Sequence, residues 1–329
     1  MKFIDMHCDT LMHAYLRKQE TAKEMPESMV DVRRMKEGGA LAQFFAMFLL
    51  PPGAEKMMGL EKPVDDDEYL DALTAIFNRT MEQCADVIAP ARCLADVRRN
   101  EEAGKMSGIL AIEDGRSVDG KLEKIDKYYD MGVRYISLTW NHENCFGAPN
   151  STDPAIMEKG LTDFGKQAVE YLFQKGILVD VSHLSDGGFA DVAALSAKAG
   201  KPFVATHSNL RSLSPHQRNL REDMFQTLAE RGGVAGINFG PEFLNADIQR
   251  KDSTAELMSK HIRRMIELGG EDAVGLGSDF DGIHGQLEID QVSKMPLLFD
   301  RLKKDGLTER QIEKIAYGNV LRVIGEAMR

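Results

Sequence analysis

The sequence predicts an α/β protein folded as a (β/α)8 TIM barrel. Eight short apolar runs recur along the chain, and segments with helical periodicity separate most of them. Most of these runs are apolar at consecutive positions, as strands buried on both faces of a parallel sheet require. A length of 329 residues fits one such barrel, and no internal repeat, low-complexity tract or linker divides it. We therefore expect residues 1–329 to form a single domain.

The eight apolar runs are the predicted strands, and they alternate with helices over most of the chain. In chain order, the strands are expected at Phe3–Met6, Gln43–Leu49, Gly108–Ile112, Val133–Leu138, Ile177–Val181, Pro202–Thr206, Val234–Asn238 and Ala273–Gly277. The helices are expected at Glu68–Val87, Lys121–Met131, Asp163–Lys175, Asp186–Ala199, Glu222–Arg231, Thr254–Leu268 and Thr308–Met328. Eight strands with intervening helices favour a closed barrel over an open sheet.

Local signals mark several of the helix ends. Thr308 and Gln311 are spaced as a capping box, in which two side chains satisfy unpaired N–H groups at a helix start. A glycine follows each of five predicted helices, as a left-handed residue at a helix C-terminus would: Gly132, Gly176, Gly200, Gly232 and Gly269. Two long loops, 50–67 and 142–160, follow strand C-termini, which form the active-site face of such a barrel.

The charge and cysteine content exclude several classes of protein. With 41 basic and 52 acidic residues, the formal net charge is −11, which argues against binding to nucleic acid or to an anionic membrane. The 4 cysteines are too scattered for a disulfide framework or a Cys-x-x-Cys metal motif. The first residues turn polar early, and no apolar stretch is long enough to cross a membrane. We expect a cytoplasmic protein without a membrane anchor.

Potential metal ligands end several of the predicted strands. Because the strand C-termini of a barrel converge on one mouth, residues far apart in sequence are expected to meet there. Taken singly, each histidine would more often be a hydrogen-bonded structural residue, but a mixed set of imidazoles and carboxylates suits zinc, cobalt or manganese. The residues at these strand ends are His7, Asp9, Glu113, His183, His207 and Asp279.

The number of candidate ligands favours two metal ions over one. A single catalytic zinc usually takes three protein ligands, and even without Asp279 these strand ends offer three histidines and two carboxylates. Glu113 ends its strand alone, and its two oxygens could bridge a pair of cations. The alternative for Glu113 is an ion pair with Arg116 at a helix start. Cys8, between His7 and Asp9, is expected to pack in the core, with a thiolate ligand as the less favoured reading.

The chain resembles the membrane (renal) dipeptidases, metallopeptidases built on the amidohydrolase type of barrel. The resemblance covers nearly the whole length, and its motifs occur in order at the expected strand ends. The motifs are Asp5-Met-His7-Cys-Asp9, Ile112-Glu113-Asp-Gly115, Arg134-Tyr-Ile-Ser-Leu-Thr-Trp-Asn141, Val179-Asp-Val-Ser-His183, Thr206-His207-Ser208, Gln217-Arg218-Asn219, Gly277-Ser-Asp279-Phe-Asp-Gly282 and Tyr317-Gly-Asn319-Val-Leu-Arg322.

This resemblance implies a role for each matched residue. It places His7 and Asp9 on a first zinc ion and His183 and His207 on a second. Glu113 would bridge the two ions. By the same resemblance, Asp279 handles the proton of the bridging water, and Arg218 binds the substrate's terminal carboxylate.

The sequence departs from the family pattern at the end of the fourth predicted strand. There the family has a histidine thought to polarise the scissile carbonyl, and this chain has Trp140. His142, two residues later, is the candidate replacement if the loop bends. We therefore include both residues among the candidates for substrate binding, and His142 among those for catalysis.

The resemblance implies a binuclear zinc dipeptidase that cleaves the amide bond of dipeptides with a metal-bridging hydroxide. Its substrates would include dipeptides with a C-terminal D-residue, and Mn²⁺ or Co²⁺ are alternatives to Zn²⁺.

A second interpretation is another amidohydrolase activity, such as a deacylase, lactonase or phosphoesterase. Many of those relatives open with two histidines separated by one residue, unlike His7-Cys-Asp9. A third is a non-catalytic ligand-binding barrel. A homodimer is compatible with the fold, although no local feature identifies an interface.

Overall fold

A closed ring of parallel strands forms the centre of the protein in this computed structural model, which describes residues 1–51, 53, 56–60, 62–247 and 249–329. Among these described residues, the ring order is β2, β1, β10, β8, β7, β6, β5 and β4, and β4 pairs back to β2. The bounds are β1 Phe3–Asp5, β2 Ala40–Phe48, β4 Met106–Glu113, β5 Val133–Ser137, β6 Leu178–Asp180, β7 Val204–Ala205, β8 Val234–Ile237 and β10 Val274–Leu276. The predicted (β/α)8 TIM barrel is confirmed.

Each predicted strand corresponds to a strand of the ring, although several are shorter than the apolar run that predicts them. Three further strands were not predicted. β3 (Ile88–Pro90) pairs with the beginning of β4, and β9 (Asp252–Ser253) pairs with β11 (Gln286–Leu287) in a separate sheet. These strands are only two or three residues long, so they carry no apolar run by which a sequence pattern could find them.

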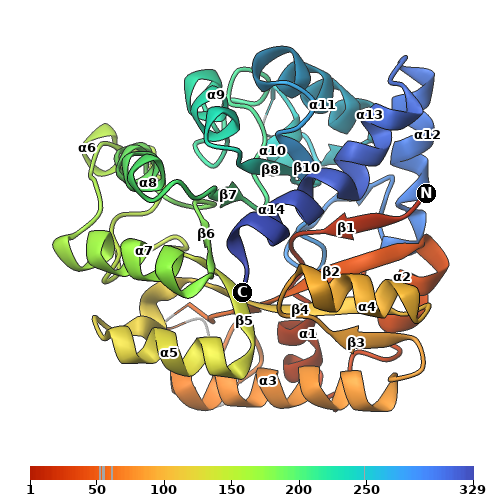
Figure 1. Cartoon of the computed structure of the whole chain (residues 1–329), viewed down its shortest axis with the longest axis horizontal. Helices are drawn as coiled ribbons and strands as arrows, with labels where there is room; N and C mark the ends of the chain where they lie inside the picture. The colour runs from red at the N-terminus through yellow and green to blue at the C-terminus, as the bar shows by residue number, and fades with distance from the viewer. Residues whose placement is uncertain (52, 54–55, 61, 248) are drawn as a thin grey trace.

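Helices surround the ring (Figure 1). Those that match predictions are α3 Asp66–Gln83, α5 Leu122–Met131, α7 Asp163–Lys175, α8 Asp186–Ala199, α9 Glu222–Glu230 and α11 Ala255–Gly269. The predicted helix Thr308–Met328 comprises α13 Glu309–Glu313, a π-helical turn at Lys314–Gly318 and α14 Asn319–Ala327. Helices without a prediction are α1 Thr10–Leu16, α2 Val32–Gly38, α4 Leu94–Glu102, α6 Pro154–Met157, α10 Pro241–Leu244 and α12 Pro296–Lys304. No helix among the described residues is both long and apolar enough to cross a bilayer.

Most of the predicted helix-end signals are present. The capping box at Thr308 and Gln311 is confirmed at the start of α13. Gly132, Gly176 and Gly200 cap their helices in the left-handed conformation, and Gly232 follows α9 with a φ of 73°. The prediction for Gly269 was wrong by one residue, because Gly269 ends α11 and Gly270 has the positive φ of 84°.

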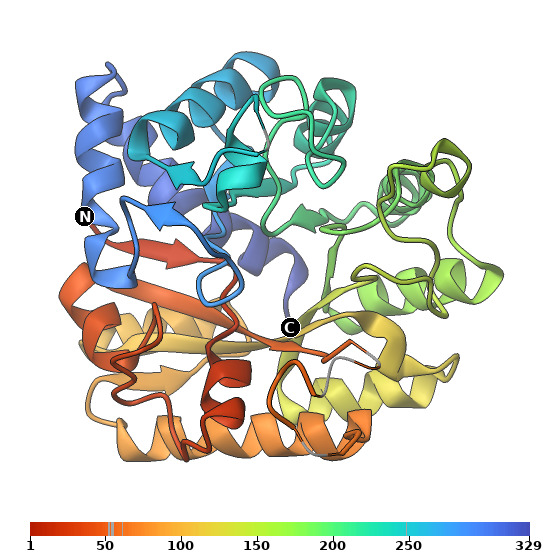
Figure 2. The same ribbon diagram turned by 180° about the vertical axis from the view of Figure 1, so that it is seen from behind.

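Helix α14 closes one end of the barrel. Figure 1 shows it crossing in front of the ring, whereas in Figure 2, from the opposite side, it lies behind the ring. Its apolar residues, such as Val320 and Ile324, are buried with inward-facing strand residues, such as Ile4 and Phe44, in one core cluster. A second cluster fills the layer between strands and helices. One end of the ring is thus sealed by apolar packing, and the polar strand ends lie at the other.

Two buried carboxylates tie neighbouring strands together below the open end. The Asp5 carboxylate, on β1, accepts hydrogen bonds from the Ser278 backbone N–H at 2.8 Å and hydroxyl at 2.7 Å, just beyond β10. The Asp180 carboxylate, on β6, accepts the Thr206 N–H at 2.8 Å and hydroxyl at 2.7 Å, and also bonds from Ser137 and Ser182. Buried charges of this kind require such donors. Each carboxylate therefore fixes the backbone from which potential metal ligands emerge.

The Asp180 network predicts a large loss of stability on truncation. Asp180→Ala leaves several buried donors without an acceptor, so we expect the free energy of unfolding to fall by about 3 kcal/mol or more. Ser137→Ala, the matched control, removes one donor and should cost about 1 kcal/mol. Urea unfolding of both variants in the presence of a chelator measures the difference. Equal and small losses would contradict this role of Asp180.

Candidate metal centre and active site

The open end of the barrel brings together the six strand-end residues that the sequence singles out. His7 and Asp9 follow β1, Glu113 is the last residue of β4, and His183 and His207 follow β6 and β7. Asp279 follows β10. All six are buried, with Asp279 the most exposed at 9%. They come from strands on different sides of the ring, so closure of the barrel is what places them in contact.

Glu113 lies at the centre of this cluster. Its Oε1 is 3.0 Å from Nε2 of His183 and 3.4 Å from Nε2 of His207. Its Oε2 is 3.3 Å from Nε2 of His7. The two oxygens of one carboxylate therefore face two different sets of imidazoles. The alternative pairing with Arg116 is not seen, because Arg116 instead pairs with Asp114 and Asp66.

The two remaining carboxylates lie around His7. Its Nε2 is 3.7 Å from Oδ2 of Asp9 and 3.7 Å from Oδ1 of Asp279. The potential ligand atoms of His7, Asp9 and Asp279 lie within 4.8 Å of one another, as do those of His7, Glu113 and His207. Two overlapping groups of metal-binding side chains thus share this part of the barrel mouth.

The donor atoms of the cluster fit divalent cations. Nε2 of His7, Nε2 of His207 and Oδ1 of Asp9 are buried and have no hydrogen-bond partner among the described residues. The other imidazole nitrogens are held in hydrogen bonds: His7 Nδ1 to Tyr135 at 2.8 Å, His183 Nδ1 to Asn141 at 3.1 Å and His207 Nδ1 to Thr206 at 2.7 Å. Such bonds orient a metal-binding histidine and leave its Nε2 free to coordinate a metal ion. Unpaired buried nitrogens and carboxylates are costly unless a cation is bound.

The carboxyl groups in the metal-free cluster have shifted pKa values. Burial raises the pKa of Asp9 to about 6 and that of Asp279 to about 7. For Glu113, burial is outweighed by the charge of His7 and by the close approach of the three imidazoles, so its pKa lies well below the usual range. Glu113 is therefore ionised even in acidic solution, Asp9 is largely ionised at neutral pH, and Asp279 is partly protonated there.

The histidines divide into one charged and two neutral rings. Burial lowers the pKa of His7, but the Tyr135 and Glu113 groups outweigh it, so the pKa of His7 is raised. Burial and the nearby charge of Arg218 lower the pKa of His183 to about 3, and burial, with the charge of His7, lowers the pKa of His207 as well. The rings of His183 and His207 are therefore neutral, the form that can bind a metal ion.

Arg218 is buried beside the histidines. Its Nη1 donates to Ser208 Oγ at 3.2 Å and its Nη2 to the His207 carbonyl at 3.3 Å. Its guanidinium lies 5.5 Å from the centre of the Phe243 ring, and its Nε has no partner in the described part of the chain. The hydrogen bonds that the described structure gives to this guanidinium go to a hydroxyl and a carbonyl and not to a carboxylate, so its charge is available to a ligand in the adjoining cavity.

A cavity of about 490 Å³ opens over the cluster. Asp9, Glu113, His183, Arg218 and Asp279 line it, together with apolar side chains from α1, β2, α10 and neighbouring loops. These apolar residues are Met12, Leu16, Phe48, Pro51, Met57, Met58, Trp140 and Phe243. The volume is in the range typical of small-molecule sites. Part of one wall comes from the predicted loop 50–67, of which residues 52, 54–55 and 61 lie outside the described residues.

Trp140 and His142 are placed differently. Trp140 lines the cavity, with its ring centre 6.1 Å from that of His183 and 5.1 Å from that of Phe48. His142 is exposed, lies 5.9 Å from the Trp140 ring, and is not among the described residues that line the cavity. The structure therefore brings Trp140, but not His142, to the site.

Several supporting residues escaped sequence reasoning. Asn238 donates to Oδ2 of Asp279 at 2.8 Å, and it ends a predicted strand just as the candidate ligands do. The supporting roles of Asp5 and Asp180 are likewise not among the predictions from the sequence. An acid within an otherwise apolar strand is the signal that could have singled out both. The thiol of Cys8 is buried against the Phe44 carbonyl, in agreement with a packing role.

The barrel and the cluster define a class of protein, the metal-dependent hydrolases that carry their active site at the strand C-termini. Comparison of the chain with known protein families identifies one family within this class. The family model of the membrane dipeptidases, peptidase family M19, matches residues 1–329. The chain belongs to this family, and it is a hydrolase of the metallo-dipeptidase type.

Named relatives agree with this assignment. The dipeptidase aclJ of Aspergillus oryzae is 31% identical over 300 residues, covering 90% of this chain and 69% of that protein. The crystal structure of dipeptidase AC, a family M19 metallopeptidase, has a TM-score of 0.87 at 27% identity, over 99% of this chain and 98% of the other. A Rhodobacter sphaeroides metallopeptidase, liganded with a phosphinate mimic of L-Ala-D-Ala, has a TM-score of 0.86 at 27% identity, over 99% of each chain.

The pKa values predict that cation binding releases protons. A cation requires deprotonated ligands, but Asp9, with a pKa of about 6, and His7, with a raised pKa, hold protons in mildly acidic solution. Affinity for Zn²⁺ or Mn²⁺ should therefore rise with pH through this range. Calorimetric titration of chelator-treated protein, in two buffers of different ionisation enthalpy, counts the protons released. An affinity independent of pH, with no proton release, would contradict the charge states described above.

Proposed function

We propose that this dipeptidase uses two divalent cations, Zn²⁺ with Mn²⁺ or Co²⁺ as alternatives, held on either side of Glu113. The observation that carries the proposal is the division of the Glu113 carboxylate, whose Oε2 faces His7 and whose Oε1 faces His183 and His207. In this arrangement, His7 and Asp9 would hold one cation, and His183 and His207 would hold the other. The Glu113 carboxylate would be within reach of both.

A pair of cations supplies an acidified water molecule and an electrophile for the amide carbonyl. The polypeptide supplies the proton transfer through Asp279. Oδ2 of Asp279 is fixed by Asn238, and Oδ1 faces the cluster. This geometry suits a group that accepts a proton from the attacking water and returns it to the departing amine. The raised pKa of Asp279 shows how strongly burial disfavours its charge without cations nearby.

Arg218 supplies the recognition of the substrate's free C-terminus. Its planar guanidinium can pair two N–H groups with a carboxylate, and burial excludes the water that would weaken the pair. The short reach from Arg218 to the cluster, both of which line one cavity of about 490 Å³, favours a dipeptide over longer peptides. The phosphinate mimic of L-Ala-D-Ala bound by the Rhodobacter relative supports acceptance of a C-terminal D-residue.

Trp140 contributes an apolar wall next to His183. The proposal does not depend on His142, because its side chain would have to enter the cavity from an exposed position. Polarisation of the carbonyl by His142 would require the loop after β5 to move. Arg218 would also suit a phosphate or the carboxylate of an acylated amino acid, so membership of the dipeptidase family, and not Arg218 alone, favours a dipeptide over the deacylase, lactonase and phosphoesterase alternatives.

The role of Asp279 predicts a separation of activity from metal content. Asp279→Asn retains the size of the side chain and its bond to Asn238 but cannot take up the proton. We expect kcat for a dipeptide to fall by about 10²–10⁴-fold, with the metal content of the purified protein unchanged. Steady-state kinetics combined with elemental analysis gives both quantities. As a control, chelation of the wild type should abolish turnover and added Zn²⁺ should restore it. Turnover that survives verified metal removal would refute the proposal.

A further inference from the structure

The loop that carries Arg218 is clamped by a second arginine, Arg211. The guanidinium of Arg211 donates from Nη2 to the Gln217 carbonyl at 3.0 Å and from Nε to the Asn219 carbonyl at 3.0 Å. These carbonyls belong to the residues immediately before and after Arg218. Arg211 therefore holds the backbone on both sides of the residue proposed to bind the substrate carboxylate.

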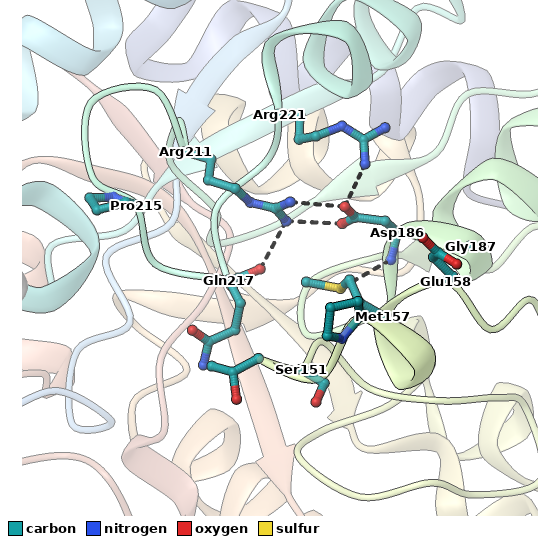
Figure 3. Close-up of a pocket in the computed structure, with 11 residues that line it drawn as sticks. Ser151, Met157, Glu158, Asp186, Gly187, Arg211, Pro215, Gln217 and Arg221 are labelled. Carbon is teal, nitrogen blue, oxygen red and sulfur yellow. Dashed lines mark hydrogen bonds and ion pairs between the residues drawn. The ribbon is translucent and has the colours of Figure 1, made fainter.

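The same guanidinium also reaches the segment that carries His183. Its Nη1 and Nη2 donate to Oδ2 and Oδ1 of Asp186 at 2.8 and 2.9 Å, as a two-pronged pair (Figure 3). Asp186 is the first residue of α8, three residues beyond His183. Asp186 is well buried at the side chain, with 12% exposed, and Arg211 has 23% exposed. The pair is thus better shielded from solvent than an ordinary surface ion pair.

A further arginine, Arg221, makes a useful contrast. It donates to Asp186 and to Asp223, as Figure 3 shows for Asp186, and its side chain is 45% exposed. No hydrogen bond joins its side chain to residues 217–219 in the described structure. Both arginines line a surface cavity, but their charges are already matched by Asp186 and Asp223. We therefore interpret the two arginines as residues that support this loop, and not as a binding site for an anion.

Resting on the proposed function, we propose that Arg211 is a positioning residue that sets the spacing between Arg218 and the metal-binding cluster. One side chain links the loop that holds the substrate's carboxylate to the segment that presents His183. A dipeptide has a fixed distance between its scissile carbonyl and its C-terminal carboxylate. By fixing both segments, Arg211 therefore keeps the distance from Arg218 to the cluster equal to the length of a dipeptide. Small displacements of a positioning group have large kinetic effects.

Side-chain bonds from Asn219 support the loop in a different direction. Its Nδ2 donates to the Ser214 carbonyl at 3.0 Å and to the Phe243 carbonyl at 3.0 Å, beyond β8. Loss of Arg211 should therefore leave the loop folded and attached near β8, while its link to the His183 segment is lost. The expected result is a displaced Arg218 in a protein that still binds its cations.

The test compares Arg211→Met with the matched control Arg221→Met, which makes the same charge change beside the same aspartate. Each is assayed with a dipeptide and with the same dipeptide amidated at its C-terminus. For the free acid, Arg211→Met should raise KM about tenfold or more, with a smaller change in kcat. For the amide, which has no carboxylate for Arg218, kcat/KM should change little. Arg221→Met should stay within about threefold of the wild type for both substrates.

A double variant shows whether Arg211 acts through Arg218. In an Arg218→Met background, adding Arg211→Met should raise KM no further, because coupled residues give non-additive effects. Additive effects, an equal loss with the amide, or an unchanged KM in Arg211→Met would overturn the proposal. If Arg211→Met does not fold, Arg211→Lys retains the charge without the planar fork, and a wild-type KM in that variant would equally overturn it.

The same measurements separate this inference from the function on which it rests. If Arg218→Met leaves KM for the free acid unchanged, the proposed role of Arg218 in binding the carboxylate fails. If Arg218→Met raises KM and Arg211→Met does not, only the positioning role of Arg211 fails. Metal content and thermal unfolding of each variant verify that the cluster and the fold are retained.

Discussion

The approach of three imidazoles to the Glu113 carboxylate is the interaction on which the rest of the site depends. Glu113 ends β4, and the histidines come from β1, β6 and β7, so they meet only because the ring closes. Its Oε2 lies 3.3 Å from His7, and its Oε1 lies 3.0 Å from His183 and 3.4 Å from His207. A carboxylate divided in this way gives the barrel mouth two adjacent binding positions, and the cavity, Arg218 and Asp279 are arranged around them.

Such a concentration of buried charge is costly, and hydrogen bonds within the fold offset only part of the cost. Below the cluster, Asp5 and Asp180 are satisfied by donors from neighbouring strands, so they stabilise the backbone at the strand ends. Within the cluster, His7 Nε2, His207 Nε2 and Asp9 Oδ1 remain without hydrogen bonds from the described residues. The first pair of acids supports the architecture, and the unpaired atoms are available to cations. Different carboxylates thus support the fold and bind cations, and in the case of Asp5 and Asp9 they lie on the same segment.

Much of the fold and the cluster could be predicted because both depend on strand positions. An apolar run locates a buried strand, and the residue after it lies at the barrel mouth, as with Glu113 and His207. Side-chain direction beyond a strand end depends on local backbone geometry. His183 and Asp279 have positive φ values of 68° and 62°, which no pattern of residue types reveals.

For the same reason, the exposed position of His142 could not be read from its distance along the chain. The clamp at Arg211 was also invisible, since it depends on tertiary contacts with two backbone carbonyls. A cytoplasmic location and a homodimer remain predictions.

Anomalous diffraction at the zinc edge, from crystals of the protein grown with Zn²⁺, tests the central claim most directly. Our account predicts two peaks about 3.5–4 Å apart, one beside His7 and Asp9 and the other beside His183 and His207. The Glu113 carboxylate should lie between them. A single peak, or two peaks that do not share Glu113, would contradict the account.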